Sequence, residues 1–224
     1  MFLVRTTDIL GDMLKLILLL SPVYVTLFWS ITLHTNRVKG SEPKFFLGRF
    51  MGIACLLFFS HMLYFLPLPG LYHYADPFYH LLSLLVYPIY YVYIRLLTVD
   101  RVFDWKKHGV YFLPALLLFL LYLAGVLLMT KDEHLDYLYS LLLSGEKLSG
   151  IFLYQKSVYL TCRVVFMIQG LVYMWLSIRL VAANKKNVQN YYANTSADNL
   201  DKIYWLNISL FVTIVFGIIL SLIG

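Results

Sequence analysis

Polar and ionisable side chains inside long apolar stretches are the residues of this sequence best placed to do chemistry. Arg163 lies within the apolar run 155–181. A charge inside a bilayer costs about 2.5–3.5 kcal/mol or more, so it faces a polar interior or reaches back to the interface. In the first case Arg163 is an anchor for an anionic small ligand that enters from outside. In the second it bonds only to carbonyls and tyrosines.

Two histidines fall at a depth similar to that of Arg163 in neighbouring apolar runs. His61 lies near the end of one run and His80 near the start of the next. Together they predict a polar pocket that opens outward, although each histidine could instead bond locally at the interface. The full set of candidate ligand-binding residues is Arg163, His61, His80, Gln169, Tyr159, Tyr64 and Tyr79.

The motifs of catalysis and metal binding are missing from these runs. The sequence has no His-Glu-x-x-His, no Cys-x-x-Cys and no pair of histidines four residues apart, which are the spacings that bring metal ligands together. Ser60, Ser83 and Ser177 lack the Gly-x-Ser-x-Gly context of a nucleophile. We therefore expect no enzyme activity, no catalytic residue, no metal and no cofactor.

The composition places these residues in a membrane. Of the 224 residues 61% are hydrophobic and only 13% are charged, against about 25% charged in soluble domains; the mean hydropathy is +0.75. This excludes a soluble enzyme, a disordered chain and a free nucleic-acid-binding domain, and favours an all-α bundle of membrane-spanning helices. Cys55 and Cys162 lie in apolar runs and are expected to be reduced and buried.

Six stretches are long and apolar enough to cross a bilayer, which takes about 20 residues. They form a single integral membrane domain over residues 1–224. The predicted spans are 13–33, 45–66, 77–97, 110–130, 155–181 and 203–223.

Basic residues set the expected orientation. Lys and Arg concentrate in the first, third and fifth loops, whereas residues 67–76 contain neither. Because basic loops stay in the cytoplasm, the N-terminus is expected outside the membrane, which the chain crosses several times. The longest outer loop, 131–154, is interpreted as a short helix on the membrane surface; the alternative is a lid over the pocket.

Two stretches resemble the membrane sensor region of AraC-type helix-turn-helix transcription regulators of Bacteroidetes. Residues 85–117 read LVYPIYYVYIRLLTVDRVFDWKKHGVYFLPALL, and the resemblance rests on residues 93–95, Asp100, Lys106, Lys107, His108 and 112–114. Residues 190–195, followed by Leu200 and Trp205, are similar to a second element of the family, which usually has Ser where Ala193 stands.

The resemblance implies a sensor and signal-transduction module without the DNA-binding part, which in that family follows a seventh span. The expected partners are membrane lipid, an unknown small ligand from the outer side, and an effector domain beyond Gly224 or on a separate protein. A homodimer is compatible with the sequence, and no nucleic acid is expected to bind these residues. Two alternatives stay open: a small, complete transporter-like protein, and a non-catalytic assembly subunit.

Overall fold

Helices make up all the regular structure in the described part of the chain. The computed structural model describes residues 2–35, 42–66, 68–100, 102–142 and 147–191, with scattered positions between 204 and 215. The elements are α1 (Phe2–Thr35), α2 (Glu42–Phe65), α3 (Pro69–Thr98), α4 (Trp105–His108), the 3₁₀ helix η1 (Gly109–Phe112), α5 (Leu113–Leu127), α6 (Lys131–Asp136), the π-helix η2 (Tyr137–Leu141) and α7 (Gly150–Tyr191). The predicted all-α class is confirmed for these residues.

Five stretches of the described residues are long and apolar enough to cross a membrane: Met13–Thr35, Pro43–Phe65, Pro69–Thr98, Trp105–Leu127 and Gly150–Asn184. Each overlaps one of the first five predicted spans. The sixth prediction, 203–223, lies outside the described residues apart from scattered positions.

The start of the third span differs from the prediction in a way that matters for the site. The loop expected over 67–76 is wrong from Pro69 onward, because α3 begins there. Proline suits the first turn of a helix, and the amides of Leu71 and Tyr72 both bond to the carbonyl of Leu68, at 3.1 Å. Asp76, assigned to a loop by the sequence, therefore lies inside a membrane-spanning helix.

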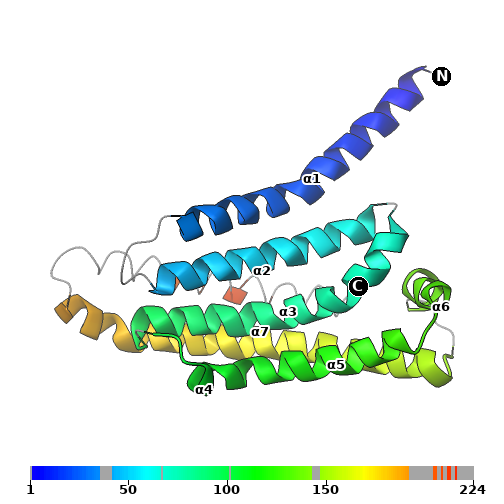
Figure 1. Ribbon diagram of the computed structural model, residues 1–224. Helices are drawn as coiled ribbons and strands as arrows, with labels where there is room; N and C mark the ends of the chain where they lie inside the picture. Colours follow the sequence, from blue (N-terminus) through cyan, green and yellow to red (C-terminus); the bar gives the residue numbers. More distant parts are fainter. Residues whose placement is uncertain are drawn as a thin grey trace.

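Helix α3 is the centre of the bundle. It packs against α2, α5 and α7, whereas α1 packs mainly on α2 (Figure 1). The largest apolar cluster joins Leu84 of α3 to Tyr122 of α5 and Cys162 of α7. Both cysteines are buried and free, as predicted. The apolar stretch of α1 contributes no buried residue, and many of its large apolar side chains are exposed, so α2 covers only part of this helix.

The segment after α5 closes one end of the bundle. Thr130 caps α6: its hydroxyl accepts from the amide of Glu133, whose carboxylate accepts from the amide of Thr130, a reciprocal capping box. These bonds also lower the pKa of Glu133. The chain continues into the π-helix η2, a geometry frequent at functional sites. Figure 1 shows α6 beside the first turns of α3.

Candidate functional site at Asp76

A buried carboxylate organises the end of the bundle that α6 closes. Asp76 is 1% exposed. The hydroxyl of Tyr72 donates to its Oδ1 at 3.1 Å, and that of Tyr122 donates to its Oδ2 at 2.7 Å. Burying a charged carboxylate costs free energy unless hydrogen-bond donors surround it. These contacts therefore offset the cost of burying Asp76.

Two histidines complete the surroundings of the carboxylate. His134 Nε2 lies 3.2 Å from Oδ2, and His80 Nε2 lies 3.7 Å from Oδ1. A carboxylate in its ionised form only accepts hydrogen bonds, with two oxygens available. The two tyrosine hydroxyls donate hydrogen bonds to the carboxylate, and the two Nε2 atoms lie within ion-pair distance of it, so these surroundings favour the anion.

The second nitrogen of His134 extends the cluster toward its edge. His134 Nδ1 lies 2.8 Å from His73 Nδ1. His134 is fully buried and His73 half-buried. One nitrogen of such a pair must donate and the other accept, so both rings cannot be cations while this bond persists. We call Asp76, Tyr72, His73, His80, Tyr122 and His134 the Asp76 cluster.

The cluster joins α3, α5 and the segment α6–η2, and it borders α7. The ring of His80 packs at a tilt against Tyr122 with centroids 4.1 Å apart, and it meets the ring of Tyr159 edge-on at 5.6 Å. Tyr137 is fully buried over the cluster. Burial and the nearby Asp76 charge raise the pKa of its hydroxyl. Among the residues that the structure describes, this hydroxyl has no hydrogen-bond partner.

The predicted pocket residues divide into three groups. His80 belongs to the cluster and Tyr159 touches it. On the adjoining surface His61 stacks on Tyr79 at 6.0 Å, and Tyr64 meets Tyr72 at 5.1 Å.

The other two predicted residues lie elsewhere. Arg163 is exposed, within electrostatic range of Tyr79. Gln169 is buried, and its amide has no partner in the described ranges. Both residues lie on α7 (Gly150–Tyr191), and the pocket around Arg163 stays a prediction.

Sequence reasoning missed the carboxylate at the centre. The predicted spans leave Asp76 in the connection 67–76, just before the third span. Tyr72, Asp76 and His80 are spaced four residues apart, which puts them on one face of a helix. This signal becomes readable only once α3 is known to start at Pro69. His134 carried no such signal, because its role depends on how α6 folds back.

A second polar cluster lies at the other end of α3. Asp100 accepts from Arg95 Nε at 2.8 Å and from Lys107 Nζ, and it lies 3.1 Å from His108 Nε2. Burial alone would raise the pKa of Asp100, but the hydrogen bonds from Arg95, Lys107 and His108 outweigh it and hold this pKa well below its usual range. Arg95 also donates to the hydroxyl of Tyr111 at 3.1 Å. These residues fix the turn between α3 and α4.

We expect Asp100→Asn to remove part of the acid sensitivity of the fold. A lowered pKa means that the stabilisation is complete above the ordinary value of 3.8 and is lost as the pH falls below it. Near neutral pH, Asp100→Asn should lower the free energy of unfolding by about 2 kcal/mol. A larger effect is not expected, because Lys107 is half exposed and its charge is screened by solvent. Thermal unfolding in detergent at about pH 3, 5 and 7 measures this, with the exposed Asp132→Asn as control. Equal pH dependence in Asp100→Asn and the unmodified protein would contradict the role of the ion pairs.

Comparison of the chain with known protein families, curated proteins and solved structures finds no match. Within the described residues, no three histidine, cysteine or acidic side chains are arranged to hold a metal ion. The site is therefore interpreted from its own geometry.

Proposed function

We propose that the chain is a non-catalytic, membrane-embedded sensor and signal-transduction module whose receiving part is the segment α6–η2. One observation carries this proposal. His134, on a segment outside the apolar spans, contacts Asp76 inside a span at 3.2 Å. A signal that displaces α6 must break this contact. The loss would leave a buried carboxylate without one of the polar groups that surround it, so the packing of α3 would respond.

Helix α3 offers a route from this end of the bundle to the other. It carries Asp76 in its early turns and Arg95 in its last turn, where the Asp100 cluster begins. By the positive charge of the loops, the Asp76 end faces outside and the Asp100 end faces the cytoplasm of a bacterial inner membrane. The sequence resemblance to AraC-type membrane sensor regions supports the same assignment, with an effector domain or partner on the cytoplasmic side.

Protonation is a direct way to perturb the receiving segment. Once His73 and His134 are both cations, each Nδ1 is a donor and their bond is lost. The charged and titratable groups that face this pair are Tyr72, Asp76, His80, Tyr122, Lys131 and Tyr137. We expect acidification on the α6 side to loosen α6 from α3.

Spin labelling tests this response in liposomes. After Cys55 and Cys162 are replaced by alanine, a label at Asp132→Cys on α6 should gain mobility between about pH 7.5 and about pH 5. A label at the exposed Trp175→Cys on α7 should not. The variant His73→Phe lacks the imidazole pair and should show the loosened state at both pH values. An Asp132 label with unchanged mobility in the unmodified background would overturn the proposal.

A proton-coupled transporter is the second candidate function, and the buried Asp76 favours it, because transporters use ionisable groups within the membrane. A pH-sensitive dye enclosed in the same liposomes separates the two. A sensor changes label mobility without sustained proton flux across the membrane. Flux that follows an imposed gradient and is abolished by Asp76→Asn would identify the transporter instead.

A further inference from the structure

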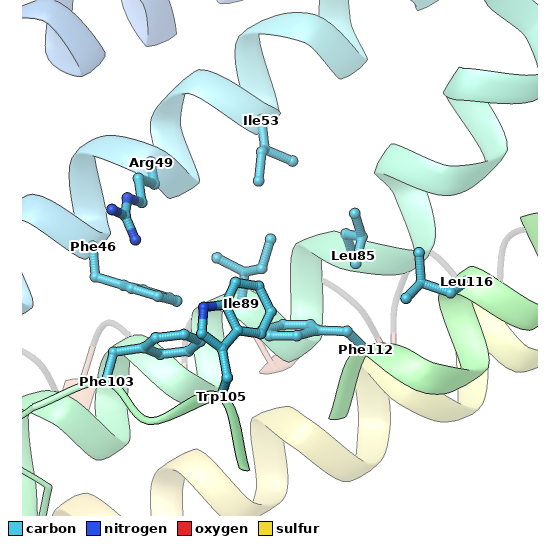
Figure 2. A pocket seen from close by; sticks show the side chains of 9 residues that line it. All are labelled: Phe46, Arg49, Ile53, Leu85, Ile89, Phe103, Trp105, Phe112 and Leu116. Carbon is cyan, nitrogen blue, oxygen red and sulfur yellow. The ribbon is translucent and has the colours of Figure 1, made fainter. Parts of the chain in front are cut away.

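An apolar cavity of about 330 Å³ lies between α2, α3 and the η1–α5 segment. Figure 2 shows side chains from these elements and from the α3–α4 connection turned toward it. They are Phe46, Arg49, Ile53, Leu85, Ile89, Phe103, Trp105, Phe112 and Leu116. Its volume is within the range of about 300–1,000 Å³ that is typical of small-molecule sites.

The packing of the bundle explains why this space is open. Helices α2 and α5 each pack on α3, and Ile89 of α3 lies between them in Figure 2. At the mouth, Leu116 is 46% exposed and Trp105 is 72% exposed. Both positions belong to an apolar stretch capable of crossing a membrane. In a bilayer, acyl chains are therefore the molecules that meet this opening.

An acyl chain gains little by leaving the bilayer for the cavity, because lipid tails are as apolar as the lining. Selective retention must come from the headgroup. Arg49 is the one basic residue among those that line the cavity. Its side chain is exposed, with the guanidinium 4.4 Å above the ring of Phe45. No carboxylate in the described ranges forms an ion pair with it, so its donors can reach a ligand.

The chemistry of the rim fits a phosphate. A guanidinium presents paired N–H donors that match phosphate oxygens. Trp105 adds an indole N–H donor and a ring suited to the membrane interface. The exposed Lys106 follows it in the chain, and the loop charges place this end toward the cytoplasm, where anionic lipids attract basic segments.

We propose that this cavity is a binding site for one acyl chain of an anionic membrane phospholipid, with the lipid phosphate held by Arg49. The site is separate from the Asp76 cluster and does not depend on the sensor function. It predicts a preference for phosphatidylglycerol over the zwitterionic phosphatidylcholine at this position of the bundle.

Trp105 provides the measurement, because it lines the cavity. In the full chain carrying Trp29→Phe, Trp175→Phe and Trp205→Phe, bromine on a lipid chain quenches the remaining tryptophan on contact. The protein is placed in phosphatidylcholine bilayers, and either brominated phosphatidylglycerol or brominated phosphatidylcholine is titrated in. Both lipids carry the phosphate, but in phosphatidylcholine the choline cation offsets its charge. We therefore expect phosphatidylglycerol to reach half-quenching at an about fivefold lower mole fraction, the ratio expected for one basic residue beside a lipid of net negative charge.

Three variants test the assignment of the headgroup and of the chain. Arg49→Gln should bring the ratio close to one, whereas Arg49→Lys should keep part of it. Arg179→Gln in the same background is the matched control, because this guanidinium also lies over the aromatic side chain at position 175, 4.8 Å from the ring of Trp175 in the unmodified chain, but away from the cavity. Ile53→Phe fills the cavity and should weaken quenching by both lipids.

Two outcomes would overturn the proposal. Equal quenching by the two lipids would mean that only the ordinary lipid shell touches Trp105. A preference for phosphatidylglycerol that survives Arg49→Gln would place the anionic contact elsewhere. Each variant must be folded for its quenching to be interpreted, and circular dichroism in the same bilayers tests whether it is.

Discussion

Asp76→Leu is expected to destabilise the bundle by about 3–5 kcal/mol, the loss typical of breaking a buried charge cluster from one side. Leucine is similar in size but accepts no hydrogen bond. The hydroxyls of Tyr72 and Tyr122 would then lose their hydrogen-bond acceptor, and His134 Nε2 would lose the carboxylate that lies 3.2 Å from it. Each such buried group left without its partner costs about 1–3 kcal/mol. Asp76→Asn keeps one acceptor oxygen and should lose about half as much.

Thermal or detergent-induced unfolding, followed by circular dichroism, measures the loss. Asp132→Leu is the matched control, since Asp132 is an exposed carboxylate in the first turn of α6. Its loss should stay below about 1 kcal/mol, the value of a surface charge at a helix N-terminus. If Asp76→Leu proves as stable as Asp132→Leu, the contacts of the buried carboxylate contribute nothing to the stability of the bundle.

Gly125→Leu is expected to cost about 3 kcal/mol, because α5 and α7 approach closely at this glycine. A Cβ placed on Gly125 would come within 1.9 Å of Gln155 Oε1 and 3.0 Å of Tyr154 Cε1. Gln155 is fully buried, so its amide has little space into which to move. Leucine would force the two helices apart and disturb Tyr122, whose carbonyl accepts from Gln155 Nε2 at 3.5 Å.

Position 124 supplies the control for this prediction. Ala124 is adjacent in α5 but exposed, so Ala124→Leu adds the same bulk toward lipid and should change stability by no more than about 0.5 kcal/mol. Gly125→Ala should lie between the two, with a loss of about 1–2 kcal/mol as the Gln155 side chain rearranges. Equal unfolding midpoints for Gly125→Leu and Ala124→Leu would contradict the close approach of the two helices.

These two predictions concern one junction of the molecule. Tyr122 donates to Asp76 through its hydroxyl and accepts from Gln155 through its carbonyl. It therefore connects α5 both to Asp76 of α3 and to Gln155 of α7. A displacement of α6 that weakens the Asp76 contacts has a physical route into three helices of the bundle.

The apolar runs were readable from composition and length alone. A bilayer needs about 20 apolar residues for a crossing helix, and that demand is local to each stretch. The first five predicted spans therefore overlap the five found among the described residues. The burial of both cysteines could be predicted in the same way, because each lies deep in an apolar run.

The start of α3 was harder to predict, because polar and aromatic residues surround its first turns. Proline, tyrosine and histidine at 69–76 are as typical of a loop at the membrane interface as of a helix. Only packing against α2, α5 and α6 makes the helical start favourable. Asp76 could then be buried, because donors from other elements reach it.

Tertiary packing also determines which residues surround Asp76. Tyr122 lies 46 residues from Asp76 in the chain, and no periodicity relates them. His134 reaches the carboxylate only because α6 folds back over α3, and Arg163, the most informative residue by sequence, is exposed on α7. Hydropathy is a property of a segment, so the sequence shows it directly. A buried charge is stabilised by polar atoms from several segments of the chain, and these atoms come together only in the folded bundle.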